Sequence, residues 1–134
     1  MLAMNGDSIV QMSLPAMRDL HMKNAARATI ALVKREDTSR YGQVEVNEGG
    51  WVTSFREKNG ERAEGFINAG VYLFEPCVIE EIVAQHALSI EREVLPAQIS
   101  RGLLAFTTDG YFIDIGVPED FLRAQAELGA SMRA

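Results

Sequence analysis

Apolar and polar residues recur along this chain with two different periods, which predict where its helices and strands lie. Between Ser13 and Ala26 the apolar residues lie three or four positions apart, so we expect a surface helix capped by Ser13, with Pro15 in its first turn. The unbroken apolar runs 28–33 and 66–74 are typical of buried strands in parallel sheets, which are covered on both faces. These runs therefore predict two core strands.

Shorter patterns between and after these runs predict a β-hairpin and two more helices. Residues 41–46 and 51–55 alternate with period two, and the Asn-Glu-Gly-Gly segment 47–50 supplies the turn between them. A helix begun by a proline is expected over 76–85, and another, begun by a serine cap and ended by a glycine, over 89–102. The hairpin thus separates the two core strands along the chain.

The C-terminal part continues the alternation of strands and helices. Residues 103–107 and 111–115 predict two strands joined across the Asp-Gly turn 109–110, and Pro118 begins a final amphipathic helix. Because strands and helices alternate throughout, we expect an α/β layer structure with a mixed, mostly parallel sheet. The length suits one domain over residues 1–134.

Composition limits the partners that this chain can have. Its 19 acidic residues outnumber its 13 basic ones and no basic stripe forms, which argues against nucleic acid as a partner. A single cysteine, Cys77, excludes an intrachain disulfide and a cysteine metal cluster. The N-terminal residues do not match an export signal, and no apolar run reaches the length of a membrane span. We therefore expect a cytoplasmic protein without a membrane partner.

Two aspartates next to short apolar segments are candidates for metal binding. Asp7 lies on an Asn-Gly-Asp turn, and taken alone a simple turn is the better interpretation. Asp114 is flanked by Ile113 and Ile115, so its charge needs a cation, a metal or several backbone donors, although hydrogen bonding to the following turn explains it equally well. If the two carboxylates converge at strand ends, they form a Mg²⁺ site suited to phosphate chemistry.

A third group of residues carries side chains suited to a sugar phosphate. Glu57 can accept two hydrogen bonds from vicinal hydroxyls, Lys58 offers a point charge for a phosphate, and Asn68 can both donate and accept. Each has a structural alternative, because Glu57 and Lys58 can form a solvated strand end and Asn68 can be a buried structural amide. The residues alone leave both interpretations open.

Five motifs follow one another along the chain, namely Asn5-Gly6-Asp7-Ser8, Arg40-Tyr41-Gly42-Gln43-Val44, Phe55-Arg56-Glu57-Lys58, Asn68-Ala69-Gly70-Val71-Tyr72 and Phe112-Ile113-Asp114-Ile115-Gly116-Val117-Pro118-Glu119-Asp120. In this order and spacing they resemble the nucleotidyltransferase family that makes nucleotide sugars. The Ser89-Ile90-Glu91 segment and the form of the last motif look closest to the heptose-1-phosphate guanylyltransferase branch. The resemblance covers essentially the whole chain and implies a Rossmann-like three-layer fold.

This resemblance implies a reaction and a role for each candidate residue. In that family an oxygen of a sugar 1-phosphate attacks the α-phosphorus of a nucleoside triphosphate and pyrophosphate leaves, so positioning and Mg²⁺ supply most of the catalysis. The implied substrates are a sugar 1-phosphate and a nucleoside triphosphate, expected to be GTP. By resemblance, Asp7 and Asp114 hold the metal, Gly42 lets the backbone approach the sugar, Glu57 and Asn68 bind hydroxyls, and Lys58 binds the phosphate.

The chain departs from the family pattern at two places. Val117 stands where the family usually has threonine before Pro118, which removes a hydroxyl and keeps the turn. The family's glycine-rich loop, which cradles the triphosphate, lies upstream of the Asn-Gly-Asp turn, and only residues 1–4 precede that turn here. We therefore expect an N-terminally truncated C-terminal part of the domain that is inactive alone.

Three hypotheses about the chain differ in what they predict. The first is an enzyme fragment, which should expose an apolar sheet edge and self-associate or fold poorly. The second is a non-catalytic module that keeps sugar-phosphate binding or only a dimerising surface, so a homodimer is one outcome. The third is an unrelated small α/β scaffold without a sugar site. The five ordered motifs favour the first.

Overall fold

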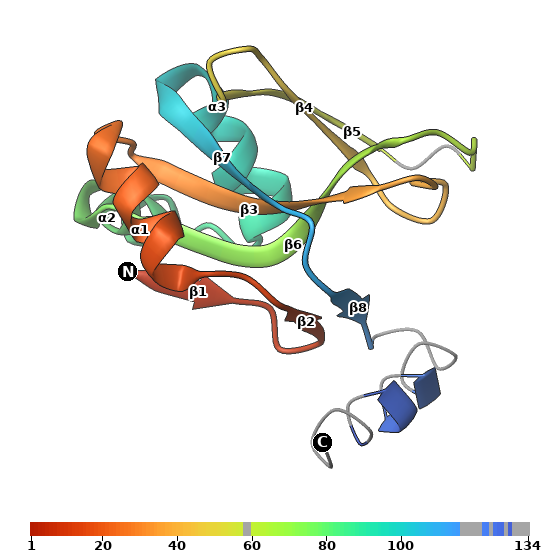
Figure 1. The fold of residues 1–134 in the computed structure, drawn as a ribbon. Helices are drawn as coiled ribbons and strands as arrows, with labels where there is room; N and C mark the ends of the chain where they lie inside the picture. Colours follow the sequence, from red (N-terminus) through yellow and green to blue (C-terminus); the bar gives the residue numbers. More distant parts are fainter. Residues whose placement is uncertain (58–59, 116–121, 124, 128, 130–134) are drawn as a thin grey trace.

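The computed structural model describes residues 1–57, 60–115, 122–123, 125–127 and 129, and its centre is a six-stranded sheet (Figure 1). The strands are β1 (Leu2–Met4), β3 (Ala28–Arg35), β4 (Gln43–Val46), β5 (Val52–Arg56), β6 (Gly65–Phe74) and β7 (Leu103–Thr108). Five of them follow the order β5-β4-β6-β3-β7, and β1 also pairs with β6. The long strand β6 therefore has β3 on one edge and both β4 and β1 on the other.

One face of the sheet is covered by the helices that follow β6. These are α2 (Pro76–Gln85), the π-helix η1 (Ile90–Val94) and α3 (Leu95–Gly102). They bury Ile30 and Leu32 of β3, both fully inaccessible to solvent. Because a buried Leu or Ile side chain stabilises the fold by about 1.5–3 kcal/mol, this face holds much of the core.

The other face is covered by α1 (Leu14–Lys23), which lies across the sheet from α2 and α3 (Figure 1). Met17 of α1 packs against Ala31 and Val33, the β3 residues that alternate with those of the first face. The strand β3 is thus buried on both sides. The expected α/β architecture in three layers is confirmed by this arrangement.

The expected strand direction is wrong for most of the sheet. Within the described residues only β3 and β7 pair in parallel, whereas β3 with β6, β4 with β5, β4 with β6 and β1 with β6 are antiparallel. Two physical facts explain the error. First, a strand that is buried on both faces has a continuous apolar sequence whatever the direction of its neighbours. Second, the chain between β3 and β6 forms a hairpin, whereas a parallel pair needs a helical crossover.

A separate two-stranded sheet packs on the α1 face. It consists of β2 (Ser8–Val10) and β8 (Phe112–Asp114), which pair antiparallel. The expected strands at 103–107 and 111–115 therefore exist but belong to different sheets. The turn between them runs tightly against the residue that follows β2, since a Cβ on Gly110 would come 2.1 Å from the carbonyl oxygen of Gln11.

The sequence-based helix predictions are confirmed where the structure describes them. Ser13 caps α1 by accepting a hydrogen bond from the Ala16 amide (3.2 Å), and α2 has the expected bounds. The predicted helix at 89–102 is divided into η1 and α3. Pro118 and the start of the predicted last helix lie outside the described residues. Across the part that the structure describes, no helix has the length and apolar character to span a bilayer.

The strand β1 forms an apolar edge of the sheet. Leu2 is 43% exposed and Met4 60%, while the intervening Ala3 packs on the core. Among the described residues β1 pairs with β6 alone. The strand β1 therefore leaves two apolar side chains exposed at this edge of the sheet.

Candidate functional site

A cavity of about 1000 Å³ lies where the edge of β6 is left open between its two neighbours. The strand β4 pairs with β6 at Phe66 and β1 pairs with it from Val71 to Leu73, so Asn68 lies in the gap between them. The lining residues come from both sheets and from η1 and α3. They are Asn5, Asp7, Ser8, Tyr41, Gly42, Gln43, Val44, Phe55, Arg56, Glu57, Ile67, Asn68, Glu91, Arg92, Leu95, Pro96, Phe112 and Asp114.

Most of the residues predicted from sequence line this one cavity. Asp7, Gly42, Glu57, Asn68 and Asp114 are all part of its wall. Lys58, the predicted phosphate ligand, lies outside the described residues, so its place stays a prediction. The structure brings together residues that are up to 107 positions apart in sequence, counted from Asp7 to Asp114 (114 minus 7).

The two aspartates lie at the same end of the small sheet, Asp7 in the turn before β2 and Asp114 as the last residue of β8. Ser8 is the register partner of Asp114, and the Ile115 amide donates to the carbonyl oxygen of Asp7 at 2.7 Å. Asp114 is half-buried at the end of β8, and Asp7 is exposed at the mouth of the cavity. Strand pairing therefore holds the backbones of Asp7 and Asp114 close together at one end of the small sheet, and both residues line the cavity.

This pair of carboxylates fits the requirements of Mg²⁺. The ion binds through one or two carboxylates and takes its remaining ligands from water and substrate phosphates. No group of three or more His, Cys, Asp or Glu side chains suited to a metal occurs in the described part of the chain. The donor set of Asp7 and Asp114 consequently suits Mg²⁺ better than a metal that requires a closed protein cage.

Asn68 faces the cavity with an amide that already has protein partners. Its Nδ2 donates to the Tyr72 hydroxyl at 2.8 Å, and its Oδ1 accepts from the Gly70 amide at 2.8 Å. Asn68 therefore has structural partners within β6, but it is half-buried rather than buried. Because an amide nitrogen carries two hydrogens and an amide oxygen two lone pairs, capacity for a ligand hydroxyl remains.

Tyr72 supports Asn68 from inside the core. Its side chain is fully buried, and this burial is the main cause that raises the pKa of Tyr72 to about 12, against a smaller lowering by the Asn68 hydrogen bond. The phenol therefore stays neutral at physiological pH. As a neutral hydroxyl, it remains a fixed acceptor for the Asn68 amide.

Gly70 brings the Asn-Gly-Asp turn close to β6. It has a φ of +78°, and a Cβ there would come 2.8 Å from Nδ2 of Asn5. The backbone amide of Asn5 donates to the backbone carbonyl of Gly70 at 2.7 Å. This close approach fixes the turn that carries Asp7.

Gly42 has a packing role that the sequence analysis did not anticipate. A Cβ on Gly42 would come 2.8 Å from the carbonyl oxygen of Arg56, the residue before Glu57. The missing side chain therefore lets the loop before β4 pass close to the end of β5. Approach of a sugar to this backbone stays a prediction.

Sequence reasoning did not assign two charged residues that line the cavity, Glu91 and Arg92, or one contact near it, made by Arg35. Glu91 and Arg92 reach it from η1. Arg35, at the end of β3, donates from Nη2 to the Phe112 carbonyl at 2.7 Å and lies over the Phe112 ring at 5.5 Å, which ties β8 to the large sheet. The available signal for η1 was the four-residue spacing of Ser89 and Glu93.

Comparison with known proteins gives concordant matches along the whole chain. The sequence model described as nucleotidyl transferase matches residues 1–131. The chain is 36% identical over 130 residues to a mannose-1-phosphate guanylyltransferase of Mycobacterium tuberculosis, covering 95% of this chain and 36% of that protein. It is 35% identical over 125 residues to a D-glycero-alpha-D-manno-heptose 1-phosphate guanylyltransferase of Aneurinibacillus thermoaerophilus, covering 92% and 54%.

A solved structure matches the fold as well. The crystal structure of HddC from Yersinia pseudotuberculosis superposes with a TM-score of 0.82 at 30% identity, over 95% of this chain and 54% of that one. The chain thus spans between about a third and about half of the length of these three relatives, from 36% to 54%.

Proposed function

Since this chain belongs to the nucleotidyl transferase family, whose model matches residues 1–131, we propose that it takes part in forming a nucleotide sugar and pyrophosphate from GTP and a sugar 1-phosphate. The observation that carries the proposal is the pair of strand-end carboxylates, Asp7 and Asp114, on the wall of one cavity with Glu57 and Asn68. We place the reaction in the cytoplasm.

In this proposal the residues of the chain act by binding and orienting. Asp7 and Asp114 hold Mg²⁺, which when bound neutralises charge on the reacting phosphates. Glu57 accepts hydrogen bonds from sugar hydroxyls, and Asn68 donates its remaining amide hydrogen to another. Lys58 is proposed for the sugar phosphate by resemblance alone. Alignment of the two substrates then supplies most of the rate enhancement.

The proposal includes a heptose or mannose 1-phosphate as sugar substrate. Relatives named as heptose-1-phosphate and mannose-1-phosphate guanylyltransferases are 35% and 36% identical to this chain, so identity alone does not rank the two sugars. Both names specify guanylyl transfer, which supports GTP as the nucleotide.

We further propose that the chain alone binds a sugar 1-phosphate without releasing pyrophosphate. The described lining holds the carboxylates Asp7, Glu57, Glu91 and Asp114 but only two guanidinium groups, which is a poor environment for a triphosphate. Incubation with GTP, Mg²⁺ and mannose 1-phosphate, followed by a pyrophosphate assay, tests this. Release of pyrophosphate would contradict it.

A second candidate function is a non-catalytic sugar-phosphate-binding or dimerising module. The exposed apolar side chains of Leu2 and Met4 on β1 suit a dimerising surface, and the same exposure is expected of an enzyme fragment, so a separate measurement must distinguish the two. Sedimentation analysis distinguishes the candidates, because a module should form a discrete monomer or homodimer, whereas an enzyme fragment should form aggregates of mixed size.

Calorimetry with mannose 1-phosphate tests the binding site directly. We expect the chain to bind mannose 1-phosphate in the presence of Mg²⁺ and to lose at least tenfold in affinity when EDTA is added, as charge-assisted contacts are lost. Asp114→Asn should remove the Mg²⁺ dependence, while Asp19→Asn, an exposed aspartate of α1, should keep it. Absence of binding heat at millimolar ligand would refute the proposed site.

A further inference from the structure

The charges around the cavity leave one described cation available to a ligand. The described lining carries two arginines, Arg56 and Arg92. Arg56 is already used, because its Nε lies 2.6 Å from Oε1 of Glu45, whose other oxygen accepts from the Ser54 hydroxyl at 2.7 Å. Arg92 forms no ion pair within the ranges that the structure describes.

The π-helix η1 places Arg92 on the cavity wall. Val94 is buried in the core next to the start of α3, and Ile90 packs against the same cluster. Arg92 and Glu91 lie between these two anchors and line the cavity. The wider turn of a π-helix adds a residue between the anchors, a feature that often marks functional sites.

The cap of η1 keeps Glu93 away from Arg92. The Glu93 carboxylate accepts from the Leu88 amide at 2.6 Å and from the Ser89 amide at 2.7 Å. In return, the Ser89 hydroxyl accepts from the Arg92 amide at 3.2 Å. The cap therefore occupies one carboxylate close to Arg92 and orders the backbone that bears its guanidinium.

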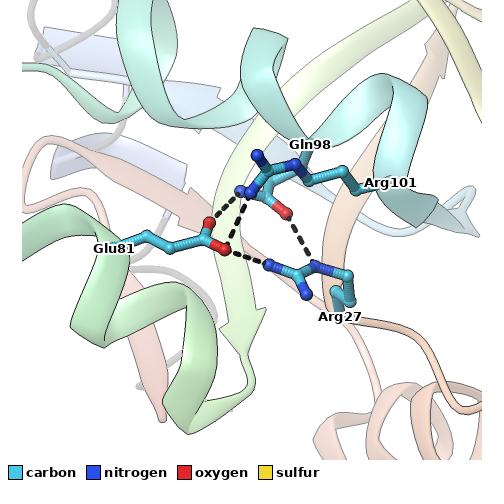
Figure 2. A network of polar contacts seen from close by, with 4 residues as sticks. All are labelled: Arg27, Glu81, Gln98 and Arg101. Carbon is cyan, nitrogen blue, oxygen red and sulfur yellow. Dashed lines mark hydrogen bonds and ion pairs between the residues drawn. The ribbon is translucent and has the colours of Figure 1, made fainter.

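A polar network anchors the helix that follows this turn (Figure 2). Glu81 of α2 accepts from Arg27 at 2.5 Å, from Arg101 at 2.7 Å and from Gln98 at 3.2 Å, the last two residues being on α3. Gln98 is only 2% exposed and also accepts from Arg27. The network fixes α3 against α2 and the start of β3, so the wall that carries Arg92 rests on a rigid support.

We infer that Arg92 is a substrate-binding residue that contacts the phosphate group of a sugar 1-phosphate in this cavity. The inference rests on the proposed function and adds a phosphate ligand to it. A phosphate monoester carries close to two negative charges at neutral pH, and the four described carboxylates of the lining repel it unless a metal and a cation offset them. The planar fork of a guanidinium matches two phosphate oxygens.

Calorimetry with mannose 1-phosphate and Mg²⁺ on three variants tests this role. Arg92→Gln should bind roughly tenfold or more weakly than the unaltered chain, as expected for a lost charge-assisted contact. Arg92→Lys, which keeps the charge but not the fork, should fall in between. Arg18→Gln removes an exposed arginine of α1 outside the cavity lining and should bind as the unaltered chain does.

A metal titration separates this inference from the proposed function. With Mn²⁺ alone, Arg92→Gln should bind the ion at least as well as the unaltered chain, because Arg92 touches the phosphate and not the metal. Equal affinity of Arg92→Gln and the unaltered chain for mannose 1-phosphate overturns the inference and leaves the proposed function standing. Failure of the unaltered chain to bind mannose 1-phosphate overturns both. Circular dichroism checks that each variant is folded.

Discussion

Two clusters of charged side chains in this molecule use the same residue types and differ in how their charges are satisfied. In the network of Figure 2, Glu81 holds both Arg27 and Arg101 within 2.7 Å. On the cavity wall, Asp7 and Arg92 form no ion pair within the described part of the chain. Charges satisfied by the protein stabilise its fold, whereas charges left facing a cavity are suited to a ligand.

Substitution of Asp7 should give the largest effect that tests this difference between the two charge clusters. Asp7→Asn should lower the affinity for Mn²⁺ about 100-fold or more, since even outer-shell residues of metal sites are worth roughly 10- to 100-fold. The thermal midpoint of the metal-free chain should stay within about 1 °C, because the Asp7 side chain is exposed. Fluorescence-detected Mn²⁺ titration and a thermal melt measure the two quantities. A large loss of stability with intact metal binding would reverse the assignment.

Gln98 should show the opposite behaviour. Gln98→Ala should cost about 2 kcal/mol of unfolding free energy, or roughly 6 °C in thermal midpoint, because a buried amide that bonds Arg27 and Glu81 is lost. Its affinity for Mn²⁺ should remain unchanged. The matched control is Gln85→Ala, which removes an exposed glutamine at the end of α2. Denaturant unfolding gives the free energies, and equal stability of the two variants would contradict the role of the network.

Tyr72 connects the core to the cavity, and its raised pKa predicts a loss of folding stability at alkaline pH. Its pKa is raised from 10.0 to about 12, so below pH 10 both states keep the proton and the stabilisation is fully present. Between pH 10 and about 12 the unfolded chain ionises first, and stability falls by up to about 3 kcal/mol.

Tyr72→Phe removes this ionisable group and gives the test. Unfolding free energies between pH 9 and 11.5 should fall more steeply for the unaltered chain than for the variant. Parallel curves would show that Tyr72 does not titrate in this way. At neutral pH the variant should lose only about 1 kcal/mol, since one hydrogen bond to Asn68 is missing.

In the network of Figure 2, the lowered pKa of Glu81 predicts a smaller loss of folding stability at acidic pH. The Arg27 hydrogen bond, followed by Gln98 and Arg101, lowers the pKa of Glu81 below 4.5. Its stabilisation is therefore present above pH 4.5 and is lost as pH falls through the lowered value. Glu81→Gln should show a flatter fall in thermal midpoint between pH 5 and 3 than the unaltered chain. A fall of equal steepness would argue against this titration.

Local elements of the fold could be predicted because their signals are local. The Ser13 cap and the turn 47–50 determine a helix start and a hairpin within a few residues. Strand direction could not be predicted from burial, because α1 and α3 cover β3 on both faces and make an antiparallel partner resemble a parallel one. The hairpin between the core strands was the signal that should have corrected it.

The candidate site could be predicted in part. The motifs pointed to Asp7 and Asp114, and pairing of β2 with β8 brings both to the wall of one cavity. Arg92 was missed because its position depends on a π-turn. The Ser89–Glu93 spacing signals a helix start but does not reveal the π-type backbone bonds, from the Val94 amide to the Ser89 carbonyl and from the Leu95 amide to the Ile90 carbonyl. The contact between Asn68 and the buried Tyr72 hydroxyl likewise depends on how β6 packs in the folded chain.

Amide NMR with Mn²⁺ tests the central claim, a metal site formed by Asp7 and Asp114, most directly. Substoichiometric Mn²⁺ broadens signals close to the ion. We expect selective broadening at Asp7, Ser8 and Asp114, with Glu81 and Gln98 unaffected. Broadening centred on Glu81, or spread evenly over the acidic surface, would contradict a metal site at this pair.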